Sequence, residues 1–173
     1  VVHSLAATLT PQIADRLGDN LERIVFLGGM LPSTGAQPIK TISPITRRLV
    51  TAFNPAEKGI QMPTMIMKRA LCNGMDRIQA KTLIERLVPD PYLPWLTPMP
   101  ALNFSSPLSL TYVVLTRDKS LSPGMQRSYA RALPSAQTVD LDAGHAAPIT
   151  HPCEIARLLL QGVPNKPPEP EEP

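Results

Sequence analysis

Apolar residues form short continuous runs near the start of the chain and in its last third, which predicts strands alternating with helices. The first run is centred on residues 24–27, within 21–29, and ends in two glycines. This is typical of a strand that is covered on both faces of a sheet. Runs at 110–116 and 138–141 predict two further strands. The alternation with helices indicates a parallel sheet.

Helical patterns lie between these runs and after them. The expected helices span residues 5–17, 122–133 and 152–161. Gly18 closes the first, and Pro11 predicts a kink in it or a late start. Ser122 is a suitable N-cap for the second, with Pro123 at its first position. The predicted fold class is therefore α/β, an open and mostly parallel sheet with flanking helices.

Between the first and second of the apolar runs, residues 31–107 have a different pattern. Frequent prolines interrupt them and predict short helices at 45–53, 65–73 and 76–87. Asp76 is the expected N-cap of the last one, whose apolar side is expected to comprise Ile78, Leu83, Ile84 and Leu87. Broken helices inserted between strands predict a lid, packed by Met62, Met65, Met67, Met75 and Met99. We therefore expect one domain over residues 1–163 and a disordered Pro/Glu-rich tail over 164–173.

Composition narrows the function. The 173 residues are 43% hydrophobic and 18% charged, with a net charge of +3 and only 4% aromatic residues. No dense basic run is present, which argues against nucleic acid as a partner. No apolar run approaches the roughly 20 residues that cross a bilayer. Two cysteines, Cys72 and Cys153, predict neither a disulfide framework nor a metal site.

The first residue is not Met and no basic segment precedes the first apolar residues, so we expect the C-terminal part of a longer cytoplasmic protein.

Three residues could carry chemistry together. Ser4 lies between a strand-like Val-Val and an Ala-rich helix, the context of a nucleophile elbow. Asp118 follows the run at 110–116, and His145 lies in the loop after 138–141. Open α/β sheets place functional groups at the carboxyl ends of their strands. The order serine, acid, histidine is the one expected for a hydrolase triad on this architecture.

Other titratable residues are weaker candidates. Asp142 is only three residues from His145 and is expected to shape the turn, and Asp140 lies within or beside a strand. His151 is expected to cap a helix or lie on the surface. His3 adjoins Ser4, but neighbouring side chains on a tight turn usually diverge. The two cysteines are expected to pack rather than to act as nucleophiles.

Four stretches then carry a resemblance that runs from Val1 to about Gln161. They are VHSLAA at 2–7, IVFLGGMLP at 24–32, YVVLTRDKSLSP at 112–123 and LDAGHAAP at 141–148. On these stretches the chain resembles the C-terminal portion of an α/β-hydrolase. It is similar to the branch that contains plant methylesterases, hydroxynitrile lyases and related bacterial esterases.

The resemblance implies roles for individual residues. Ser4 would be the nucleophile, His145 the general base and Asp118 its orienting carboxylate, with the backbone N–H of Leu5 as one oxyanion donor. Val2 stands where the family has a glycine, which bears on the geometry of the elbow. The family's second oxyanion donor comes from a loop that would precede Val1, so these residues alone are expected to show little esterase activity.

The expected function is serine-dependent hydrolysis of a carboxylic ester of a small, largely apolar substrate, without metal or cofactor. The alternative is a non-catalytic hydrolase-fold protein that binds ligands, for which Val2 is the main argument. A lyase is disfavoured, because the lyases of this branch have a lysine after the histidine where Ala146 stands here. The acyl and alcohol groups and the oligomeric state are left open.

Overall fold

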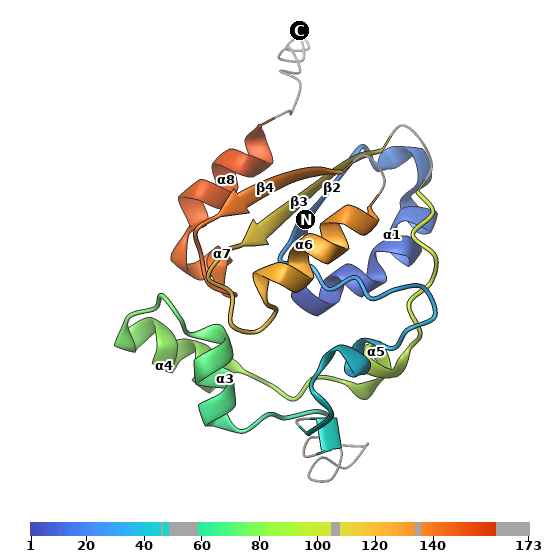
Figure 1. Cartoon of the computed structure of the whole chain (residues 1–173). Helices are drawn as coiled ribbons and strands as arrows, with labels where there is room; N and C mark the ends of the chain where they lie inside the picture. The colour runs from blue at the N-terminus through green and yellow to red at the C-terminus, as the bar shows by residue number, and fades with distance from the viewer. Residues whose placement is uncertain (46, 49–58, 105–107, 134–135, 162–173) are drawn as a thin grey trace, which may run out of the picture.

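A four-stranded, all-parallel sheet forms the centre of the computed structural model, in the spatial order β1-β2-β3-β4 (Figure 1). The structure describes residues 1–45, 47–48, 59–104, 108–133 and 136–161. The strands are β1 (Val2–His3), β2 (Arg23–Leu27), β3 (Ser109–Leu115) and β4 (Gln137–Leu141). The α/β architecture expected from the sequence is confirmed, and the three expected strands are β2, β3 and β4.

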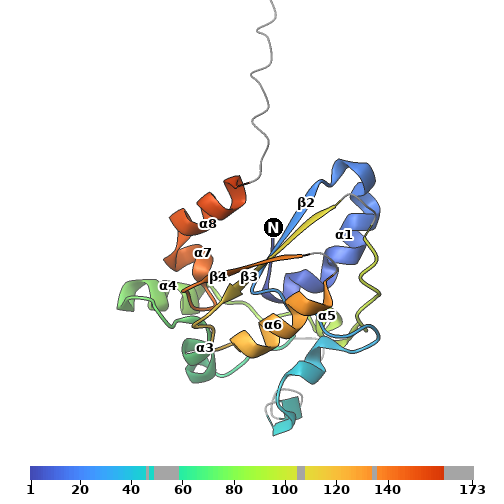
Figure 2. The ribbon, with the colours of Figure 1, turned by 45° about the horizontal axis from the view of Figure 1, so that its top comes forward.

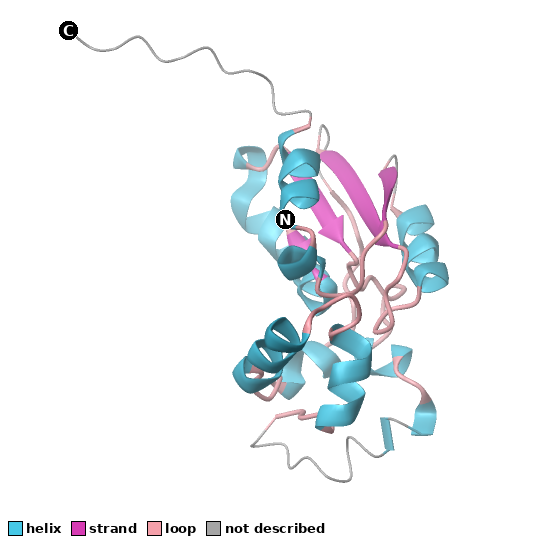
Figure 3. Ribbon diagram, turned by 90° about the vertical axis from the view of Figure 1, so that its left-hand side faces the viewer, coloured by secondary structure: helices cyan, strands magenta, loops and turns pink. Residues whose placement is uncertain are grey.

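Helices cover both faces of the sheet, as the views in Figures 2 and 3 show. The connection from β1 to β2 contains a 3₁₀ helix (Ser4–Leu9), helix α1 (Thr10–Leu17) and a second 3₁₀ turn (Gly18–Asn20). Helix α6 (Pro123–Ala132) joins β3 to β4, and α7 (Ala147–Thr150) and α8 (Pro152–Leu160) follow β4. The expected helix at 5–17 thus becomes α-helical only at Thr10, where Pro11 sits in its first turn.

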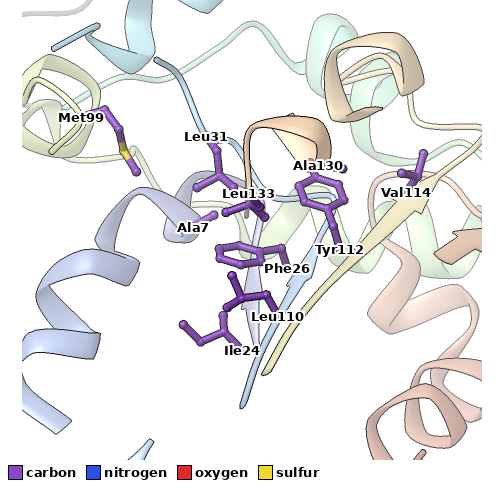
Figure 4. Packing of buried hydrophobic residues seen from close by; sticks show 10 residues of the cluster. All are labelled: Ala7, Ile24, Phe26, Leu31, Met99, Leu110, Tyr112, Val114, Ala130 and Leu133. Carbon is purple, nitrogen blue, oxygen red and sulfur yellow. The ribbon is translucent and has the colours of Figure 1, made fainter. Parts of the chain in front are cut away.

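Two apolar clusters hold the helices on the sheet, because successive strand residues point to opposite faces. One cluster contains Ile24, Phe26 and Tyr112, and packs against α6 and the 3₁₀ helix Ser4–Leu9 (Figure 4). The other contains Val25 and Leu27 and packs against α7 and α8. The central strands are therefore buried on both faces, as their continuous apolar runs predict.

The chain between β2 and β3 forms a helical insertion, which we define as residues 31–107. It contains a 3₁₀ turn (Pro38–Thr41) and helices α3 (Thr64–Leu71), α4 (Arg77–Arg86) and α5 (Tyr92–Leu96). Helices α3 and α4 lie beyond the carboxyl ends of β3 and β4 (Figure 1). The helix expected at 45–53 falls mostly outside the described residues, as does the tail at 164–173.

In the insertion, the sequence predicts helix α4 and its N-cap correctly, but it assigns one side chain to the wrong face of the helix. Asp76 caps α4 through a hydrogen bond from Gln79 N (2.8 Å), and the Gln79 side chain accepts from Asp76 N (3.2 Å). Ile78, expected on the apolar side, is instead 78% exposed. At about 100° per residue it lies roughly 140° around the helix from Leu83. The face that packs therefore excludes Ile78.

Two of the five methionines expected to pack the insertion do not pack within it. Met65, on α3, is 80% exposed. Met99 is fully buried in the cluster with Phe26 and Leu31, so it anchors the end of the insertion to the main core. None of the helices described is both long and apolar enough to cross a bilayer.

Candidate active site

Ser4 stands in a sharp turn directly after β1. Its φ is 53°, and it is the one non-glycine residue in the described ranges with positive φ. Such a conformation costs about 1–3 kcal/mol and persists where the surroundings impose it. Here the carbonyl of Ser4 accepts a hydrogen bond from Met30 N (2.9 Å). Val2 packs partly buried against the cluster around Phe26, so the elbow accommodates a valine at the position where a glycine is expected.

The three side chains singled out in the sequence meet at the carboxyl edge of the sheet. His145 Nε2 lies 2.9 Å from Ser4 Oγ, and His145 Nδ1 lies 2.7 Å from Asp118 Oδ2. A carboxylate only accepts hydrogen bonds, so the neutral imidazole carries its proton on Nδ1. Its Nε2 lone pair then faces the serine hydroxyl. This is the arrangement in which a histidine can remove the serine proton.

Asp118 is buried and tightly held. Its Oδ1 accepts from Ser120 N (2.7 Å) and Leu121 N (2.9 Å), and its Oδ2 accepts from Gln126 Nε2 (2.9 Å) as well as from His145. Gln126 is itself fully buried and also accepts from Leu115 N (2.8 Å). The sequence analysis did not single out Gln126. An amide on the core-facing side of the helix at 122–133 was the available signal.

The competing carboxylates lie elsewhere. Asp142 pairs with Arg117, Nε to Oδ1, at 2.8 Å, and also accepts from the Thr116 hydroxyl (3.2 Å). Asp140 pairs with Arg127 at 2.6 Å on the surface. Neither carboxylate forms a described contact with His145, so the turn-shaping role expected for Asp142 agrees with its contacts.

His3 corrects an expectation, because its ring does not diverge from the site. It lies against the His145 ring, with centroids 4.9 Å apart, and its Nε2 donates to the backbone carbonyl of His145 (2.9 Å). Burial, and next the proximity of His145, lowers the pKa of His3 from 6.5 to about 4. His3 is therefore a neutral donor at pH 7. The sequence placed it beside Ser4, but only the return of the 142–146 loop brings it to His145.

The remaining candidates stay outside this cluster. Cys153 is exposed on α8, and Cys72 is half-buried at the end of α3, where burial raises the pKa of its thiol. His151 contacts the Thr150 hydroxyl through Nδ1 (2.7 Å) at the start of α8. Within the described ranges, no group of three or more His, Cys, Asp or Glu side chains is placed to hold a metal ion.

A cavity of about 560 Å³ opens at Ser4 and His145. Its lining includes His3, Leu5 and Ala146, together with residues of α3, of α4 and of the chain next to these helices. Most of these further residues are apolar: Ile60, Met62, Ile66, Met67, Ala70, Leu71, Leu83, Ile84, Leu87 and Val88. Leu5 is in the first turn of its 3₁₀ helix, where backbone N–H groups lack partners within the helix.

Solved structures that are similar to this chain over most of its length include several hydrolases. An extracellular α/β-hydrolase from a Paenibacillus species matches 91% of this chain and 68% of its own length, with a TM-score of 0.76 and 20% identity. A pyrethroid hydrolase from Sphingobium faniae matches 91% and 67%, with a TM-score of 0.69 and 18% identity. An Arabidopsis methylesterase matches 93% and 66%, with a TM-score of 0.66 and 16% identity.

The chain has the α/β-hydrolase fold. The match spans about two thirds of each of these hydrolases. No family model matches the sequence, and no curated protein does. The structural similarity alone confirms the fold expected from the resemblance. In this α/β-hydrolase domain, Ser4, Asp118 and His145 each follow the carboxyl end of a strand: β1, β3 and β4 respectively.

Proposed function

We propose that the protein hydrolyses carboxylic esters of small, largely apolar substrates, with Ser4 as nucleophile. The observation that carries the proposal is the continuous hydrogen-bonded chain from Ser4 Oγ through His145 to Asp118 Oδ2. The strained backbone of Ser4 and the apolar cavity beside it support the same function. Ester hydrolysis also agrees with the names of the similar structures, which include a methylesterase and polyneuridine aldehyde esterase.

The reaction has two halves. Ser4 Oγ attacks the ester carbonyl while its proton passes to His145 Nε2, and Asp118 stabilises the imidazolium. The Leu5 N–H donates to the oxygen that becomes negative. The tetrahedral intermediate collapses, and the alcohol leaves with the proton from His145. Water then attacks the acyl-enzyme with His145 again as base, which releases the acid and restores Ser4.

The helical insertion acts in this proposal as a lid. Its helices α3 and α4 place apolar side chains over Ser4 and His145. An apolar cover excludes water from the acyl-enzyme until the alcohol has left, and it selects apolar acyl or alcohol groups.

The test is hydrolysis of p-nitrophenyl butyrate by the full-length protein, as wild type, Ser4→Ala and Ser128→Ala. Ser128 lies on α6, where its hydroxyl donates to Met125 O (2.7 Å), so its variant controls for loss of a serine. We expect Ser4→Ala to lose at least about a thousandfold in kcat, and a fluorophosphonate to label only the forms that retain Ser4. Saturable binding of the ester by the wild type without turnover would instead support the non-catalytic alternative.

A further inference from the structure

One side of the cavity carries a negative charge that the proposed reaction does not use. Among the described residues that line the cavity, the ionisable side chains are those of the two site histidines and of Asp90. No lysine or arginine is among these residues. Asp90 is exposed as a residue, and it is the one acidic group on the described, largely apolar lining, so its carboxylate influences which ligands enter.

The backbone of Asp90 is fixed in place. Its N–H donates to Ile60 O (2.9 Å), and its carbonyl accepts from Ile60 N (2.7 Å), which makes an isolated antiparallel bridge. Gly59, with φ of 76°, packs so closely that an added Cβ would lie 2.5 Å from the Asp90 carbonyl oxygen. Ile60 is buried and lines the same cavity, so the carboxylate is held at the wall.

An indole ring adjoins this carboxylate. Trp95 of α5 lines the cavity and packs against the cluster of Ile39 and Ile60. Burial raises the pKa of the Asp90 carboxyl, and the indole N–H of Trp95 offsets part of that rise. The buried Nε1 of Trp95 forms no complete hydrogen bond with Asp90 or with any other described residue. The pair therefore retains capacity to interact with a ligand.

We propose that Asp90 and Trp95 bind an amine or quaternary ammonium group of the substrate, so that the preferred substrates are cationic esters of otherwise apolar character. This rests on the proposed ester hydrolysis. A carboxylate supplies the opposite charge, and an indole face attracts cations through its quadrupole. An anionic ester would meet the Asp90 charge in a cavity whose described lining includes no lysine or arginine.

The probes are an ester pair that differs only in charge. Butyrylthiocholine carries a trimethylammonium group, and S-(3,3-dimethylbutyl) thiobutyrate has a neutral tert-butyl group in its place. We expect the wild type to favour the cationic ester by about tenfold in kcat/KM. Asp90→Asn should bring the ratio close to one, mainly through a lower kcat/KM for the cationic ester.

Two further variants sharpen the test. Glu85→Gln removes the same charge from the exposed side of α4, outside the cavity, and should keep the wild-type ratio. Trp95→Phe keeps an aromatic face, whereas Trp95→Leu removes it, so only the leucine variant should lose most of the preference. Melting temperatures of all variants identify any that fail to fold.

Failure of this proposal is distinguishable from failure of the proposed function. Ser4-dependent hydrolysis with equal rates for both esters, or a ratio unchanged in Asp90→Asn, overturns the cation site alone. If neither ester is hydrolysed, calorimetric titration with choline and its neutral isostere 3,3-dimethylbutan-1-ol decides. Tighter, Asp90-dependent binding of choline supports the site without the enzyme. Equal binding overturns the site.

Discussion

At the scale of single residues, the contacts of Asp118 determine which nitrogen of His145 carries the proton. Four donors converge on its two oxygens, from two backbone amides, Gln126 and His145. Only an ionised carboxylate can accept all four at once. The proton of His145 is thereby kept on Nδ1, which in the proposed mechanism leaves Nε2 free to act as a base toward Ser4.

We therefore expect Asp118→Asn to lose about four orders of magnitude in kcat, as the same change does in serine protease triads. The amide would donate toward Nδ1 and shift the histidine proton to Nε2, where it faces Ser4. It would also oppose the Gln126 amide, so a lower melting temperature is expected. Asp142→Asn is the matched control, because Asp142 is exposed and pairs only with surface groups. Its kcat/KM should stay within about threefold of wild type. An equal loss in both variants would contradict the assignment of Asp118.

The sequence predicts a residue of the site when the pattern that marks it is local, and it misses contacts between residues far apart in the chain. Ser4 and Asp118 were found because each directly follows a strand, and the ends of parallel strands share one edge of the sheet. The contact of His3 with His145 joins residues 142 positions apart, and no local pattern encodes such a pairing. Ile78 was misassigned because apolar character alone does not fix a helical face.

Among the elements, the connection between α3 and α4 lies against the two loops that carry Asp118 and His145. Asn73, at this connection, donates from Nδ2 to Arg117 O (2.7 Å). Gly144 precedes His145 and lies so close that an added Cβ would sit 2.5 Å from both Asn73 Nδ2 and Asn73 O. Since α3 lines the cavity, this contact ties the shape of the cavity to the position of His145.

Gly144→Ala should therefore displace the α3–α4 connection. We expect a loss of about 1–3 kcal/mol in the free energy of unfolding, typical of overpacking, and a several-fold higher KM because the wall formed by α3 moves. Gly124→Ala is the control, since nothing lies within 4 Å of the added Cβ in α6 and alanine favours helices. Urea denaturation and ester kinetics measure both effects. Wild-type stability and KM in Gly144→Ala would show that the connection is not held in this way.

For the whole molecule, burial of His3 makes stability depend on pH. The ring lies between the edge strand β1 and the His145 loop, and its pKa is about 4 in the folded protein against 6.5 as the usual value. Between these pH values the unfolded chain binds more protons than the folded one. Stability is therefore fully present above about pH 6.5 and falls as the pH drops toward 4, by about 3 kcal/mol in total.

His3→Gln isolates this contribution, because its amide can still donate to the His145 carbonyl but does not titrate. Carboxylates that titrate in the same range are common to both proteins, so the comparison is the difference between two urea denaturation series from pH 7 to pH 4. We expect the stability of the wild type relative to His3→Gln to decline steadily over this range, because only the wild type must keep an imidazole neutral. Parallel stability curves would mean that His3 titrates normally, and hence that its ring is open to solvent and does not pack against His145.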